Sequence, residues 1–228
     1  MAEILPTTLQ DQSNDLFAVK DCALIAIATG EKIVTLKELR NSLVKISLDS
    51  LYYHFWGGLL QTRFEEREYN NDFASWVRHQ LHDRILAEQL AIIDPTCYSC
   101  LEELRSTLVD IIDNRLDACE YLRWGFATRQ FEFIRSQIVV FDTGNRLRNP
   151  RELAEVIPKL SVSSVFYHFI DARQRLSDGI DDFRFWLIGF GEQYVPLCEQ
   201  LGNVDPYFGS LAELRNKLAV IFARFFRS

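Results

Sequence analysis

The chain has 228 residues, of which 48% are hydrophobic and 25% charged, a composition that indicates a globular protein and excludes a disordered or fibrous one. The longest apolar run, Cys22 to Ala28, is too short for a transmembrane helix, and Met1 to Leu16 lacks the basic and apolar segments of a secretory signal, so we expect a cytoplasmic protein whose five cysteines are reduced. The net charge of -7 argues against nucleic acid as the main partner, because such binding depends on clustered lysine and arginine.

The first half of the chain predicts a strand followed by helices. The apolar run Ala23 to Ala28 has the composition of a strand, and Thr29-Gly30 is a turn signal that predicts a short return strand after it. Thr35 is placed as the N-cap of a helix over Leu36 to Ile46. Three further helices are predicted: one that restarts at Ser47 and runs through Tyr-His-Phe, one capped by Asn71-Asp72 that carries Phe73-x-x-Trp76, and an amphipathic one over Leu101-x-Glu103-Leu104-Arg105-x-x-Leu108.

The same series of elements recurs in the second half. Residues 17–55 and 131–169 align without a gap at an offset of 114, with 11 identities in 39 positions. The strand is matched by Phe133 to Phe141 before Thr143-Gly144, and the first helix by Pro150 to Leu160 with Asn149 as N-cap. Farther on, Asp182-Phe183-x-x-Trp186 repeats the Phe-x-x-Trp helix, and Leu211-x-Glu213-Leu214-Arg215-x-x-Leu218 repeats the amphipathic one. We therefore predict a tandem duplication.

The repeat defines the expected organisation. We expect an N-terminal tail of residues 1–16, a first module of 17–116, a connection of 117–130 and a second module of 131–228. The connection lacks the Gly/Ser or Pro run of a flexible tether, so we expect one compact protein. The predicted fold class is α+β and predominantly helical, with two small helical modules that have short β-strands and pack with pseudo-two-fold symmetry.

Three blocks of the sequence resemble a known family. They are the Tyr-His-Phe block, Asn71-Asp72-Phe73-x-x-Trp76, and Phe133-x-x-Ser136-Gln137-x-Val139-Val140-Phe141-Asp142-Thr143, and together they are similar to an uncharacterised bacterial family catalogued only as a domain of unknown function. The resemblance extends over nearly the whole chain. It implies no activity, cofactor or catalytic residue, and it slightly raises the expectation of a role related to carbohydrates, because relatives are expected near enzymes of sugar metabolism.

Eight side chains at equivalent positions are the candidates for a binding site. They are Tyr53, His54, Asp72 and Trp76 in the first module, and Tyr167, His168, Asp182 and Trp186 in the second. Histidine titrates near neutral pH, aspartate can act as a base or a polar contact, and tryptophan can stack on a sugar ring. Each type also has a structural explanation: a core histidine, an aspartate that caps a helix, and a core tryptophan. If the three types converge, they form twin pockets suited to a sugar or a sugar phosphate.

Other chemistry has weaker support. His79-x-x-His82 and Cys97-x-x-Cys100 could supply four zinc ligands, but the second copy lacks them, so we expect no metal and no cofactor. Three arginines near the predicted helix at Pro150 could bind an anion or be simply solvated: Arg146, Arg148 and Arg151.

Charge is distributed unevenly. Residues 1–120 hold 11 of the 25 basic and 20 of the 32 acidic side chains, so the acidity belongs to the first half. This pattern fits either electrostatic complementarity between modules or subunits, or drift on solvated faces.

We expect a non-catalytic adaptor, regulatory or subunit-type protein that acts through a protein partner or through homo-oligomers, with no nucleic acid and no membrane partner. The alternative is a small-ligand-binding protein or enzyme that uses the twin pockets.

Overall fold

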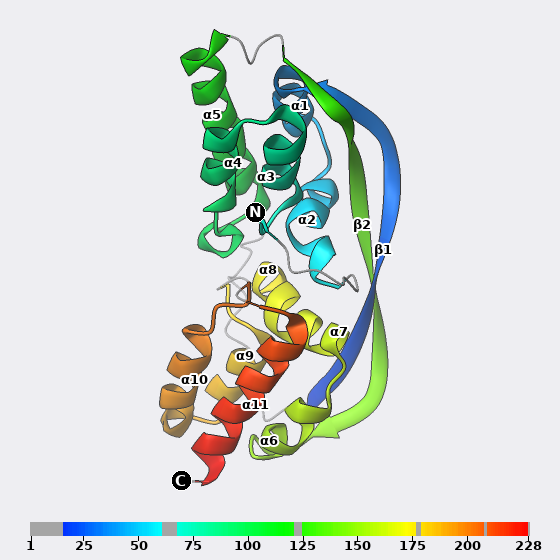
Figure 1. The fold of residues 1–228 in the computed structure, drawn as a ribbon. Coiled ribbons are helices and arrows are strands. Elements are labelled where there is room, and N and C mark those ends of the chain that lie inside the picture. The colour runs from blue at the N-terminus through cyan, green and yellow to red at the C-terminus, as the bar shows by residue number, and fades with distance from the viewer. Residues whose placement is uncertain (1–15, 61–67, 121–124, 177–178, 208, 228) are drawn as a thin grey trace, which may run out of the picture. The chain divides into compact units, whose positions relative to one another are not determined.

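The computed structural model describes residues 16–60, 68–120, 125–176, 179–207 and 209–227 (Figure 1). Helices account for most of these residues, and the described strands form one sheet of two, β1 and β2. The predicted α+β class with predominant helix is therefore confirmed. None of the helices in the described ranges is both long and apolar enough to cross a membrane.

The two strands are long. β1 spans Phe17–Thr35 and β2 spans Phe126–Leu147. The predicted turn at Thr29-Gly30, with its short return strand, is wrong, because both Thr-Gly pairs lie inside these strands. Gly30 and Gly144 have φ values of 81° and 74°, and a glycine with positive φ can bend a strand locally without reversing it.

The strands run antiparallel. The Thr29 hydroxyl donates to the Phe133 carbonyl at 2.7 Å, and the Thr143 hydroxyl donates to the Val19 carbonyl at 2.5 Å. Position numbers in one strand therefore rise as those in the other fall, which is the pairing of an antiparallel sheet.

The contacts divide the chain into two units. Unit 1 comprises Met1–Asp21 and Phe141–Ser228, and unit 2 comprises Cys22–Val140. Each strand therefore begins in one unit and ends in the other. The module bounds and the pseudo-two-fold symmetry drawn from the repeat stay predictions.

Unit 2 contains five α-helices among its described residues: α1 (Leu36–Leu43), α2 (Leu48–Trp56), α3 (Asp72–Trp76), α4 (Arg84–Ala91) and α5 (Leu101–Ala118). The Thr35 side chain accepts from the Glu38 backbone while the Glu38 carboxylate accepts from the Thr35 backbone, so the predicted cap is confirmed as a capping box. The α5 helix buries Leu104, Leu108 and Ile112 along one face, as its spacing predicts.

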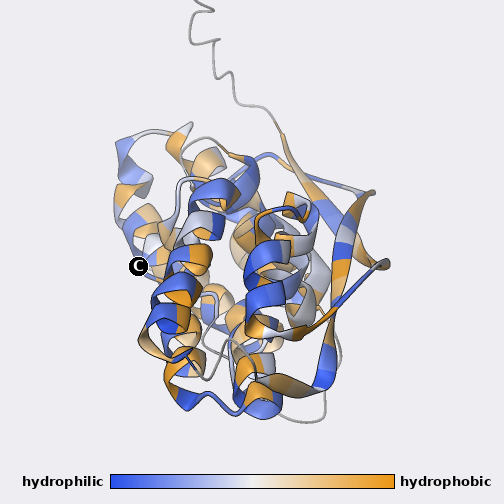
Figure 2. Ribbon diagram, turned by 90° about the horizontal axis from the view of Figure 1, so that it is seen from above, coloured by the Kyte–Doolittle hydropathy of each residue, from blue (hydrophilic) through white to orange (hydrophobic). Residues whose placement is uncertain are grey.

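Unit 1 contains the corresponding series: α6 (Glu152–Val156), α7 (Val162–Val165), α8 (Ala172–Arg175), α9 (Asp182–Ile188), α10 (Val195–Gly202) and α11 (Leu211–Arg227). The helix predicted over Pro150 to Leu160 is shorter than expected and ends in a 3₁₀ turn containing Pro158, whose missing N–H and ring disfavour a continuing α-helix. A π-helical segment, Phe166–Asp171, joins α7 to α8. Hydrophobic and hydrophilic positions alternate along the long helices in Figure 2, as expected for helices with one buried face.

Candidate functional site

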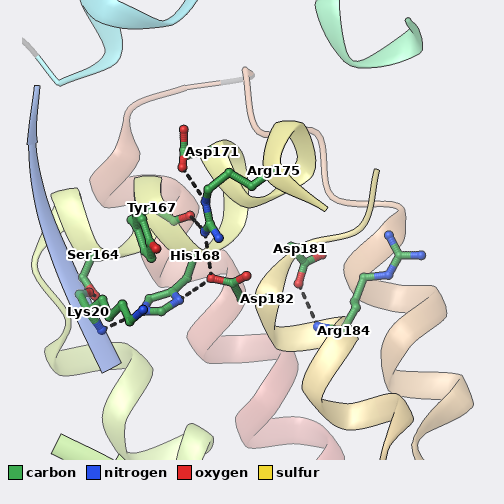
Figure 3. Close-up of polar contacts among 9 residues, drawn as sticks. All are labelled: Lys20, Ser164, Tyr167, His168, Asp171, Arg175, Asp181, Asp182 and Arg184. Atoms are coloured by element: carbon green, nitrogen blue, oxygen red, sulfur yellow. Dashed lines mark hydrogen bonds and ion pairs between the residues drawn. The ribbon is translucent and has the colours of Figure 1, made fainter. Parts of the chain in front are cut away.

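His168 lies at the centre of a polar cluster in unit 1 (Figure 3). The π-helical segment between α7 and α8 carries it, and the ring is 2% exposed. Its Nδ1 lies 2.7 Å from Asp182 Oδ2, at the first residue of α9, and its Nε2 accepts the backbone N–H of Lys20 in β1 at 2.9 Å. The imidazole therefore links a strand to the start of a helix.

His54 makes the same contacts in unit 2. Its Nδ1 lies 3.0 Å from Asp72 Oδ2, at the first residue of α3, and its Nε2 accepts the backbone N–H of Ile134 in β2 at 3.2 Å. This ring is also 2% exposed. Ile134 and Lys20 are themselves 114 positions apart, the offset that relates the two histidines.

These contacts fix the protonation of both rings. A nitrogen that accepts a backbone N–H must present a lone pair, so Nε2 carries no proton and the single proton of a neutral imidazole is on Nδ1. Nδ1 then donates to the aspartate. Each ring uses both nitrogens within the protein, which leaves no lone pair in this arrangement to take a proton from a substrate.

The two aspartates, Asp72 and Asp182, are not the N-caps of their helices. Asn71 and Asp181 are the N-caps: their side chains accept from the backbone N–H groups of Ala74 and Arg184. Asp72 and Asp182 are the first residues inside the helices, where a carboxylate also favours the positive end of the helix dipole. The capping explanation of these two residues is wrong by one position, because the preceding polar residue can cap equally well.

The aromatic candidates surround the histidines. Tyr53 and Tyr167 meet the adjacent imidazoles edge-on, at ring-centroid distances of 5.4 and 5.1 Å. Trp76 is buried, and its indole N–H donates to the Arg129 carbonyl at 2.8 Å.

Phenylalanines of the strands complete both clusters. The ring centroid of Phe131 lies 4.7 Å from that of His54 and 5.7 Å from that of Trp76. The ring centroid of Phe17 lies 4.9 Å from that of His168 and 5.2 Å from that of Trp186. The structure therefore brings all four predicted residue types together in each unit, packed against a phenylalanine.

In unit 1 an arginine, Arg175, takes part in the cluster. Arg175 Nε donates to Asp171 at 2.7 Å, its Nη2 donates to Asp182 at 3.0 Å, and its guanidinium lies 4.1 Å from the centre of the Tyr167 ring. Burial alone would lower the pKa of Arg175, but the neighbouring carboxylates, Asp182 first, raise it. Asp182 thus binds a histidine and an arginine at once.

Asp181, the N-cap of α9, is a buried carboxyl. It is completely buried, and burial raises its pKa to about 6 against the lowering effects of the Arg184 backbone N–H and of the charges on Arg173 and Arg184. The nearest Arg173 nitrogen is 4.0 Å from Oδ2. The equivalent cap in unit 2 is the neutral Asn71, whose amide donates to the Leu90 carbonyl at 2.9 Å.

Two sets of residues escaped the sequence prediction. The Ser164 hydroxyl donates to the Lys20 carbonyl at 2.6 Å, and the Ser50 hydroxyl donates to the Ile134 carbonyl at 2.8 Å. The two serines occupy equivalent positions of the repeat, and this repetition could have identified them. Arg175 lies four residues after Asp171 on one helical face, a spacing that favours an ion pair.

The weaker candidates lie elsewhere. Among the residues with described coordinates, no three His, Cys, Asp or Glu side chains converge to hold a metal. His79 pairs with Glu68 at 3.0 Å, and His82 ends its helix with a φ of 58°. Arg146 pairs with Asp142, which holds the pKa of that carboxyl well below its ordinary value.

Comparison with known proteins identifies the family. The model of the family of unknown function DUF5752 matches residues 14–223. The chain belongs to the DUF5752 family. A solved structure described as "The structure of OrfY from Thermoproteus tenax" is similar to this DUF5752 chain with a TM-score of 0.82 and 22% identity, over 96% of this chain and 100% of that one. This likeness shows a shared fold. No curated protein matches the DUF5752 chain.

Proposed function

We propose that this DUF5752 chain is a non-catalytic adaptor, regulatory or subunit-type protein of the cytoplasm that acts through protein–protein contacts. The observation that carries the proposal is the use of both nitrogens of His54 and His168 in internal hydrogen bonds. A buried imidazole held in this way orders a strand on a helical unit. We infer that His54 and His168 have a structural function.

The same proposal includes a tandem duplication. Its support is the set of contacts that recur at equivalent positions: the histidine to the strand backbone and to an aspartate, the serine to a strand carbonyl, and the threonine to the opposite strand. Side chains that repeat and keep the same partners are expected of two copies of one module.

A thermal-shift screen with sugars, sugar phosphates and nucleotides tests the proposal. A ligand at 100 times its Kd would stabilise the native state by about 2.7 kcal/mol, which corresponds to roughly 5–10 °C for a chain of this size. We expect no compound to raise the melting temperature. A rise of several degrees that the variant Asp182→Asn abolishes would overturn the proposal.

The alternative function stays a prediction. In that case Tyr53, His54, Asp72 and Trp76, and the corresponding four residues of unit 1, would bind a sugar or a sugar phosphate. The same screen tests it, because binding at these residues should be lost in the matched variants Asp72→Asn and Asp182→Asn.

A further inference from the structure

The middle third of β1 is apolar, and none of its residues is buried. Between Ala23 and Ala28, this strand has no charged or polar side chain. Ile25 is 47% exposed, and Val140 of β2 is 42% exposed. A strand with apolar residues on both faces is typical of a sheet covered on both sides, and two strands alone are marginally stable in water. This segment therefore has the composition of an interior strand and the exposure of a surface one.

One edge of β1 is open in unit 2. Ile134 of β2 uses its backbone N–H and C=O to bind His54 and Ser50 of α2, so the outer edge of β2 faces the helices there. Figure 1 shows β2 between β1 and the helices of unit 2. The described residues contain no third strand beside β1.

The register tells which backbone groups lie on that open edge. Thr29 lies opposite Phe133, and antiparallel strands alternate between residues that bond inward and residues that bond outward. The N–H and C=O groups of Ile134 point away from β1. Those of the neighbouring Phe133 therefore point toward β1, and those of its partner Thr29 point toward β2. The N–H and C=O groups of Leu24, Ala26 and Ala28 accordingly point to the open edge.

We propose that this edge of β1 pairs with the same edge of a second copy of the chain, which joins two sheets of two strands into one of four. A second strand satisfies a whole row of outward N–H and C=O groups at once, and a twofold dimer needs a surface that is complementary to itself. The proposal deepens the proposed function, on which it rests, by naming a partner and the surface that binds it.

The charges at the ends of the segment select one register. Centred on Ile25, antiparallel pairing places Leu24 opposite Ala26 and keeps the apolar residues together. Asp21 then faces Thr29, and the pairing ends before Lys20, whose N–H and C=O already bind His168 and Ser164. Centring on Ala26 instead would place Asp21 opposite Glu31, and like charges directly opposite each other are unfavourable. We therefore expect Ile25 to meet Ile25 of the second copy.

The mass of the intact chain in solution is the first test. Sedimentation velocity and light scattering from 1 to 100 μM, concentrations of the order at which weak dimers assemble, should give twice the chain mass of 26.6 kDa. A chain that stays monomeric throughout this range overturns the proposal.

Three substitutions locate the interface. Ile25→Lys places a charge in the middle of the pairing, and Ala26→Pro removes an outward N–H while leaving the inward bonds of β1 in place. Both should give monomers. The matched control is Ile92→Lys, at an apolar residue of unit 2 that is 81% exposed and distant in sequence from the strand, and it should remain dimeric. A dimer that survives both strand variants refutes the proposed surface.

Cross-linking tests the register, including for any variant that folds poorly. The cysteines that are not buried, Cys97, Cys100 and Cys119, are first replaced by serine. Ile25→Cys should then form an intermolecular disulfide on mild oxidation, because facing residues of this type of pair lie about 4.5 Å apart at Cα. Ala23→Cys, which faces Ile27 and is four positions out of register with itself, and Ile92→Cys should not. Equal linking at all three positions would contradict the register.

The two proposals can fail separately. If the chain is monomeric and binds no screened compound, the proposed self-pairing is refuted and the proposed adaptor role is not. If a ligand binds and its binding requires Asp182, the proposed adaptor role is refuted, whether or not the chain dimerises.

Discussion

Asp181→Asn should make the stability of the protein less dependent on pH. Burial raises the pKa of Asp181 from 3.8 to about 6 in the folded protein, whereas the unfolded chain keeps the ordinary value. Between about pH 4 and pH 6 the folded state therefore holds a proton that the unfolded state has lost. Linkage then requires the free energy of unfolding to fall as pH rises through this range. A shift of about two pKa units corresponds to about 3 kcal/mol lost between pH 4 and pH 7.

Urea denaturation at pH 4, 5, 6 and 7 measures this effect. The free energy of unfolding of Asp181→Asn minus that of the unchanged protein should grow by about 3 kcal/mol from pH 4 to pH 7. Other titrating groups cancel in the difference. The attraction of Arg173 for the ionised carboxylate is already contained in the pKa of Asp181 and so belongs to this slope. Differences between the amide and the protonated carboxyl in packing and hydrogen bonding add an offset that does not change with pH, so the test lies in the slope. A difference that stays constant within about 0.5 kcal/mol would refute the assignment of a buried, protonatable carboxyl.

The opposite exchange in unit 2 is the matched comparison. Asn71 is 1% exposed and caps α3 as Asp181 caps α9. Asn71→Asp removes the amide that donates to the Leu90 carbonyl and introduces a buried carboxyl, so it should destabilise the protein at pH 7 and recover in part at pH 4. Recovery at high rather than low pH would contradict the reasoning for both positions.

Three further changes test the contacts of the site and the strands. His168→Leu should abolish hydrogen-exchange protection of the Lys20 amide and lower the free energy of unfolding by about 2 kcal/mol; retained protection would contradict the hydrogen bond. Arg175→Gln leaves two carboxylates without their cation and should cost about 1–2 kcal/mol after allowance for screening, less at high salt, as read from thermal melts in low and high salt. Gly144→Ala meets no neighbouring atom but has a φ of 74°, so urea titration should show a loss of about 1 kcal/mol, whereas Gly57→Ala, whose Cβ would lie 2.6 Å from a tyrosine ring, should lose more.

Local signals in the sequence located several helix starts, although α4 and α10 were not predicted. Thr35 with Glu38, and a polar residue before Phe-x-x-Trp, specify helix starts through contacts a few residues apart, so they can be read from spacing alone. The strands were harder to predict. Thr29-Gly30 has the composition of a turn, but a glycine with positive φ suits a bend within a strand equally well, and tertiary pairing decides between them.

The histidine contacts show a second limit of sequence reasoning. The repeat singled out His54 and His168, and the aspartates near them, as a related set. Their Nε2 partners could not be found in this way, because the donors are backbone groups of Lys20 and Ile134, and any residue but proline supplies such a group. Arg175 lies between the aligned blocks of the two copies, so a comparison of those blocks passes over it.

The path of the strands has a consequence for how the protein can be divided. Phe131 packs on the histidine of unit 2, although it follows all the helices of that unit in the chain, and Phe17 packs on the histidine of unit 1 from the far end of the sequence. A chain cut after Glu120 would yield two fragments, each lacking the strand residues that complete its own core. Such fragments should be insoluble or unfolded alone and should regain structure when produced together. The protein therefore provides a natural split pair, whose reassembly can report whether two fusion partners meet.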